Sequence, residues 1–99
     1  MTIEEIRENV QIGKYRFSDH AIKRMLKRSI DRSEIVDVIM SGEIIEDYPD
    51  DKYSPSFLIY GKTQEGRDIH VQISSPPFCV VITIYEPDPN EWIEYKIRR

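Results

Sequence analysis

The chain has 99 residues, of which 39% are hydrophobic and 32% charged, and a formal net charge of −4. This length predicts one domain over residues 1–99, with a helix in 1–13, a helical part in 17–42, a sheet in 43–86 and a tail in 87–99. One cysteine excludes an internal disulfide, no apolar run is long enough to cross a bilayer, and the acidic N-terminus is unlike a signal peptide, so we expect a cytoplasmic protein.

Two short amphipathic helices are predicted before residue 30. Apolar residues repeat at helical spacing over residues 2–10, and Gly13 ends this element. Ser18 is a favourable N-cap for a second helix, which we expect to run to Arg28. The apolar arc of this second helix is expected to face the core, and it consists of Ala21, Ile22, Met25, Leu26 and Ser29.

The spacing of the apolar residues changes after a third predicted helix. Asp31 and Glu34 have the spacing of a capping box, and Gly42 ends the helix that they begin. Four β-rich runs follow, separated by turns that contain proline or glycine. They cover residues 43–48, 56–62, 67–74 and 77–87. This order predicts an α+β fold in which N-terminal helices pack on a four-stranded antiparallel sheet.

The second helix carries the first candidate site. Residues 14–32 hold seven Lys or Arg against two Asp, whereas residues 34–51 hold seven Asp or Glu and no Lys or Arg. His20 and Arg24 are four residues apart, so on a helix their side chains can reach one point. A histidine can transfer a proton and a guanidinium can bind a phosphate, which are the functions needed when a 2′-hydroxyl cleaves RNA. Ordinary solubilising charges explain the same residues, so both interpretations stay open.

Alternation along the last two strands predicts one aliphatic and one polar face of the sheet. In the third strand Ile69, Val71 and Ile73 share one face, and His70 and Gln72 share the other. In the fourth strand strict alternation forms two sets, Phe78, Val80, Ile82 and Ile84 against Cys79, Val81, Thr83 and Tyr85. A half-exposed strand with a polar outer face is an equally good explanation.

The remaining features give weaker signals. Cys79 lies in an apolar run and is expected to be a buried small hydrophobe. Asp47, Asp50 and Asp51 surround a proline and fit a solvated acidic turn better than a cation site. Since the two histidines are far apart, we predict no metal site and no cofactor. The tail is expected to be a helix, a strand or partly disordered, with Trp92 as its anchor.

Taken together, the motifs resemble a known family. The segments SDHAIKRMLKRSI, RDIHVQI and VVITIYEPDPNEW resemble, over roughly residues 15–92, a small prokaryotic family called domain of unknown function 4258. The resemblance implies the fold of the barnase, EndoU, colicin and RelE-like nucleases. It also implies a metal-independent endoribonuclease toxin that acts on RNA. Its partner would be a cognate antitoxin with a zinc-finger or helix-turn-helix domain.

From the resemblance and the helix pattern we expect two groups of site residues. The catalytic group is His20, Arg24, His70 and Tyr85, and the RNA- or phosphate-binding group is Lys27, Arg28 and Thr83. One histidine would act as base on the 2′-hydroxyl and the other as acid on the leaving oxygen, while Arg24 stabilises the phosphorane. The alternatives are a non-catalytic module that binds RNA or protein on the same fold, and a partner-binding protein without nucleic-acid contact.

Overall fold

A computed structural model describes residues 3–52 and 54–99 of the chain. Residue 2, where the first predicted helix begins, lies outside these described residues. The elements, in chain order, are α1 (Ile3–Gln11), β1 (Tyr15–Phe17), α2 (Asp19–Arg28), α3 (Arg32–Ser41), β2 (Glu43–Tyr48), β3 (Ser56–Lys62), β4 (Asp68–Ser74), β5 (Cys79–Tyr85), β6 (Trp92–Ile93) and β7 (Ile97–Arg98). The α+β class is confirmed.

The main sheet has five strands in the order β1-β5-β4-β3-β2, so the prediction of four was wrong. The additional strand is β1, which pairs in parallel with β5 and separates α1 from α2, so the helices do not form one N-terminal block. The other strand pairs are antiparallel, as predicted. A strand of three residues is too short to show a period of two, which is why the sequence pattern did not reveal it.

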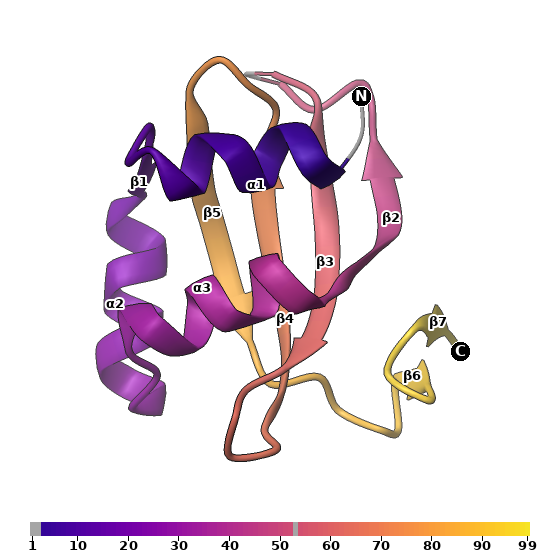
Figure 1. The fold of residues 1–99 in the computed structure, drawn as a ribbon. Helices are drawn as coiled ribbons and strands as arrows, with labels where there is room; N and C mark the ends of the chain where they lie inside the picture. The colour runs from indigo at the N-terminus through magenta and orange to yellow at the C-terminus, as the bar shows by residue number, and fades with distance from the viewer. Residues whose placement is uncertain (1–2, 53) are drawn as a thin grey trace.

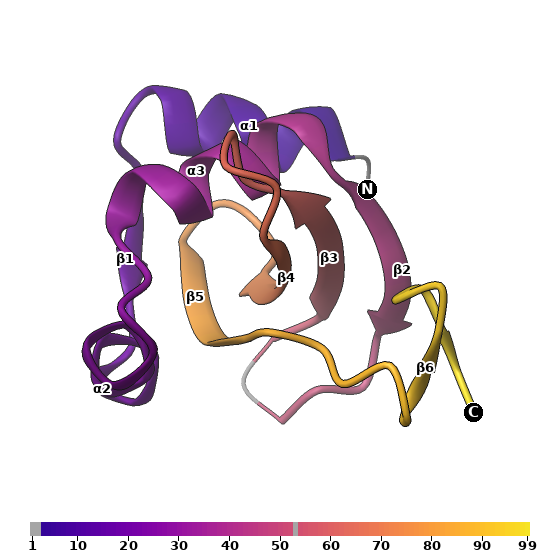
Figure 2. The same ribbon diagram turned by 90° about the horizontal axis from the view of Figure 1, so that it is seen from below.

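The two faces of the sheet have different covers. Helices α1 and α3 lie across one face (Figure 1), and their buried residues Ile6, Ile35 and Ile39 pack on Ile59 and Val71 in one hydrophobic core. Seen along the strands, α2 lies beside β5 and β1, and the segment after β5 returns below the opposite face (Figure 2). We call this opposite face, away from α1 and α3, the open face.

A bulge in the β4–β5 pairing corrects the predicted alternation of β5. Val81 is opposite Ile73 and Ile84 is opposite Val71, so the register shifts by one residue between these two pairs. As a result Cys79, Val81 and Ile84 all belong to the hydrophobic core, although strict alternation placed them on different faces. Cys79 is buried, as predicted, and its burial raises the pKa of the thiol.

The helix α2 is rotated relative to the prediction. Ala21 is fully buried and Met25 is partly buried, but Ile22 is 44% exposed and Leu26 is 79% exposed. The expected core arc is therefore wrong for these two residues and for Ser29, which is also exposed. The reason is that the helix packs beside the edge of β5 and not flat on a sheet face. Ser18 sets this position, because its hydroxyl caps the backbone N–H of Ala21 and donates a hydrogen bond to the carbonyl of Ile82.

The predicted caps and the tail anchor are also visible. Asp31 and Glu34 form the capping box of α3, as predicted. Trp92, which is 3% exposed, begins a small hairpin formed by β6 and β7. Among the described residues, no helix is long and apolar enough to cross a membrane.

Candidate functional site

The first part of the candidate site is a contact between α2 and β5. His20 is exposed near the start of α2, and its Nε2 lies 3.0 Å from Oγ1 of Thr83. Thr83 is opposite Gln72 on the open face, in a pair next to the core pair of Val71 and Ile84. Within the part of the chain that the structure describes, Nδ1 of His20 makes no hydrogen bond. When Nε2 donates its hydrogen to Thr83, this exposed Nδ1 is a free proton acceptor.

The second part is a cleft of about 460 Å³ lined by the C-terminal half of α2, the end of β5 and the segment that follows β5. Arg24 and Arg28 contribute from the helix, and Tyr85 contributes from the end of β5. No ion pair joins either arginine to another described residue. Because these two guanidinium groups form no internal ion pair, they are available to bind an anionic group in the cleft. Its complete lining is Arg24, Arg28, Tyr85, Glu86, Asp88, Glu91, Trp92 and Arg98.

The acidic residues of the cleft were not expected from the sequence. Glu86 is neutralised by Arg67 at 3.2 Å, whereas the carboxylate of Asp88 accepts a hydrogen bond only from the backbone N–H of Asn90 among the described residues. Arg98 is also internally paired, since its Nε lies 2.8 Å from a carboxylate oxygen of Glu46. The positive end of the cleft is therefore the α2 side, where Arg24 and Arg28 lie.

His70 lies beneath this cleft and is completely buried. Its Nε2 is 2.6 Å from the carbonyl of Tyr95, and its Nδ1 is 3.1 Å from the hydroxyl of Tyr85. A carbonyl can only accept, so Nε2 carries the hydrogen and Nδ1 accepts from Tyr85. Burial lowers the pKa of His70, and the ring of Trp92 packs edge-on at 4.5 Å. Neither ring nitrogen is free for a substrate in this arrangement.

Tyr85 connects the buried histidine to the cleft. Its hydroxyl donates to Nδ1 of His70, and burial raises its pKa to about 12. The phenol is therefore neutral at physiological pH and keeps a proton that it can donate. The sequence expectation placed Tyr85 and His70 in one site, and they are in direct contact.

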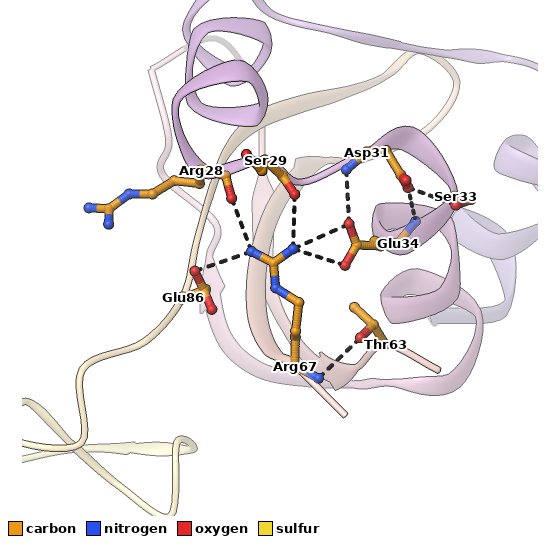
Figure 3. A network of polar contacts seen from close by, with 8 residues as sticks. All are labelled: Arg28, Ser29, Asp31, Ser33, Glu34, Thr63, Arg67 and Glu86. Atoms are coloured by element: carbon orange, nitrogen blue, oxygen red, sulfur yellow. Dashed lines mark hydrogen bonds and ion pairs between the residues drawn. The ribbon is translucent and has the colours of Figure 1, made fainter. Parts of the chain in front are cut away.

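Arg67, which sequence reasoning missed, holds the C-terminal end of α2 in place. Its guanidinium donates to the carbonyls of Arg28 and Ser29 and contacts the carboxylates of Glu34 and Glu86 (Figure 3). The side chain of Arg28 points away from this network (Figure 3). Arg67 thus links α2 and the segment after β5, which both line the cleft, to α3. A lone arginine in a β-hairpin gives no signal in the sequence.

The predicted residues therefore fall into four groups. His20 and Thr83 are in contact, and Arg24, Arg28 and Tyr85 line one cleft on the same face of the sheet. His70 supports this cleft from below. Lys27 is exposed on α2 and is not part of the lining.

The acidic turn has a structural contact, because Asp51 accepts a hydrogen bond of 2.6 Å from Ser56. Across residues 3–52 and 54–99, no group of three His, Cys, Asp or Glu side chains could hold a metal ion.

Comparison with known protein families identifies a match. The model of a family described as a domain of unknown function (DUF4258) matches residues 17–86, which extend from the end of β1 to the residue after β5. This range includes α2, β4 and β5 and therefore every predicted site residue. No curated protein and no solved structure matches the chain.

Proposed function

We propose that this chain, which belongs to the DUF4258 family, is a metal-independent endoribonuclease of the toxin type, acting on RNA in the cytoplasm. One observation carries the proposal. His20, held by Thr83, lies one helical turn from Arg24, which lines a cleft together with Tyr85. Four residues of helix correspond to a rise of about 6 Å, so a phosphate group between the two side chains can contact both.

The reaction that fits these groups is attack of the 2′-hydroxyl on the adjacent phosphate. Nδ1 of His20 takes the proton of the 2′-hydroxyl, and the 2′-oxygen forms a bond to phosphorus. The bond from phosphorus to the 5′-oxygen breaks, and the hydroxyl of Tyr85 turns its hydrogen from Nδ1 of His70 to that oxygen and transfers the proton. The products are a 2′,3′-cyclic phosphate and a 5′-hydroxyl end. Water then removes the added proton from His20 and returns a proton to the hydroxyl of Tyr85.

The arginines act on the charge that develops during this reaction. Arg24 donates hydrogen bonds to the non-bridging oxygens of the phosphorane, and Arg28 binds the next phosphate along the chain. In this proposal His70 takes no acid or base role. It is a positioning residue that holds the hydroxyl of Tyr85, because both of its ring nitrogens are already hydrogen-bonded.

The test compares three variants of α2 on one RNA oligonucleotide in the presence of a metal chelator. We expect His20→Ala and Arg24→Ala each to reduce the cleavage rate about 100-fold or more, since each removes a group that acts in the transition state. Lys23→Ala is the matched control. It removes an exposed charge from the same helix outside the cleft, and we expect a change of about twofold or less.

The wild-type product should carry a cyclic phosphate. Equal cleavage by wild type and His20→Ala would overturn the assignment, and so would dependence on an added metal. In cells, induced expression should arrest growth through RNA degradation, and co-expression of the antitoxin should relieve the arrest.

An antitoxin partner is part of this proposal, and the surface of α2 supports it. Ile22 and Leu26 are exposed one turn apart, next to the basic residues Lys23 and Lys27. An exposed aliphatic pair between cations fits an acidic, amphipathic segment of another protein. Binding there would also cover the helix that carries His20 and Arg24.

A second candidate function is a non-catalytic module that binds RNA on the same fold. The acidic residues Asp88 and Glu91 in the cleft favour it, because they weaken the attraction for a phosphate at the position where catalysis needs it. A protein of this kind would retain RNA in a salt-sensitive manner and release no product.

A further inference from the structure

A second cleft lies on the open face, at the opposite end of β5 from Tyr85. It has a volume of about 310 Å³, at the lower end of the range for small-ligand sites. Its lining comes from two segments, the entry into β1 and the start of β5. The residues are Gly13, Lys14, Tyr15, Arg16, Phe78, Cys79 and Val80.

The pairing of β1 with β5 decides which face this cleft opens on. Tyr15 is opposite Cys79 and Phe17 is opposite Val81, and all four contribute to the core on the side of α1 and α3. The pair between them, Arg16 and Val80, therefore points to the open face. This is also the face of Thr83 and Tyr85, because the bulge shifts the alternation of β5.

The cleft is thus in line with the candidate catalytic site. Val80 and Thr83 are three positions apart on the strand, which corresponds to about 10 Å along β5. The order along this edge is first the Phe78 cleft, then the contact of His20 with Thr83, and then the arginine cleft. An extended chain that crosses His20 would therefore reach both clefts.

The side chains of the cleft are those that recognise a nucleotide. Phe78 is 80% exposed, and its ring is available for stacking. The turn that carries it is fixed, since Asn9 donates to the carbonyl of Pro77 at 2.7 Å and Ser74 donates to that of Phe78 at 3.3 Å. Lys14 and Arg16 are exposed, and neither forms an ion pair with another described residue.

We propose that this cleft binds one unpaired base of the RNA next to the cleaved bond, with the base stacked on Phe78 and the flanking phosphates on Lys14 and Arg16. The inference rests on the proposed function and adds the substrate class, which is single-stranded RNA. A base inside a duplex is stacked on its neighbours and cannot pack on a protein ring. The enzyme therefore selects unpaired segments.

The test measures binding and cleavage separately, with a short single-stranded RNA oligonucleotide and its duplex. We expect Phe78→Ala to weaken binding of the single strand about tenfold and to raise KM while kcat is unchanged. Phe78→Trp should restore binding, because it restores a stacking surface. The control is Ile97→Ala, which truncates another exposed hydrophobic residue far from the cleft, at 62% exposure, and should bind like wild type.

Salt dependence tests the two cations. Lys14→Ala and Arg16→Ala should each reduce the slope of log affinity against log salt by about 0.7, the value for one phosphate contact on a single strand. Equal binding of the single strand by wild type and Phe78→Ala would overturn the subsite and leave the proposed cleavage intact. Binding that depends on Phe78 without any cleavage would support the subsite and overturn the ribonuclease proposal. Equal affinity for the duplex would also contradict the subsite.

Discussion

At the scale of single residues, the two histidines have opposite environments. His20 is exposed and makes one hydrogen bond to Thr83, whereas His70 is buried among Tyr60, Tyr85 and Trp92. In the sequence both appear among polar residues, and nothing local distinguishes them. The difference arises because the segment after β5 folds back over β4 and brings the carbonyl of Tyr95 to Nε2 of His70.

The burial of His70 makes stability depend on pH. Because burial lowers its pKa below the ordinary value of 6.5, the unfolded chain takes up a proton that the folded protein does not. The contribution of buried, neutral His70 to the free energy of unfolding is therefore fully present above pH 6.5 and is lost as the pH falls below this value. His70→Gln keeps a donor for Tyr95 and an acceptor for Tyr85 but does not titrate.

The free energy of unfolding, measured with denaturant at pH 7.5 and 5.5, tests this effect. Both pH values lie above the range in which carboxyl groups ordinarily titrate, so the difference reports on histidine. We expect wild type to lose up to about 1 kcal/mol more than His70→Gln between these two pH values. An identical loss in both proteins would show that His70 does not contribute.

At the scale of elements, α2 is held by contacts at its two ends in addition to the core packing of Ala21 and Met25. Ser18 fixes the first turn to Ile82 on β5, and Arg67 holds the carbonyls of Arg28 and Ser29 at the last turn. This arrangement turns His20 and Arg24 toward the open face and leaves Leu26 in solvent. The position of the candidate catalytic residues therefore depends on contacts made outside the helix.

Removal of the Arg67 clamp should affect both stability and function. Arg67→Ala removes the donor to the carbonyls of Arg28 and Ser29 and the ion pair of Glu34, and we expect a loss of about 2–3 kcal/mol in the free energy of unfolding. The rate of RNA cleavage should also fall, because the C-terminal end of α2, which lines the cleft, is no longer held in place. Lys62→Ala, in the same hairpin, breaks a pair whose lysine is 60% exposed and should cost less than about 1 kcal/mol. Similar losses in both variants would argue against a clamp.

At the scale of the whole molecule, the sheet separates a structural layer from a functional one. Helices α1 and α3 complete the aliphatic core on one face and cover its strands. On the open face, Arg24, Arg28 and Tyr85 line the cleft beside the C-terminal segment. The hairpin of β6 and β7 covers the far part of this face through Trp92 and the ion pairs of Lys96 and Arg98.

Trp92 should be the residue on which this cover depends. Trp92→Ala removes a side chain that is 3% exposed and packs on His70, and we expect a cost of about 3–5 kcal/mol in unfolding free energy. The adjacent Ile93 is 42% exposed, and Ile93→Ala should cost much less. Thermal denaturation of the two variants distinguishes them. A stable Trp92→Ala protein would mean that the hairpin is not an integral part of the fold.

The sequence alone determined the features that depend on near neighbours. The caps at Ser18 and Asp31 were predictable because a cap is formed within three or four residues. The strands β2 and β3 were predicted with their observed bounds because alternation and turn residues are local signals. The spacing of His20 and Arg24 on one helix face follows from helical geometry for the same reason.

Only the tertiary structure decided which of these residues meet. His20 and Thr83 are 63 positions apart, and Arg67 contacts Ser29 across 38 positions. The parallel pairing of β1, the bulge in β5 and the rotation of α2 likewise depend on segments that are distant in the chain. Such contacts form when whole elements pack to bury their apolar surface, and a local pattern does not record which packing buries the most. For this reason the candidate residues came from the sequence, and the two clefts around His20 came from the fold.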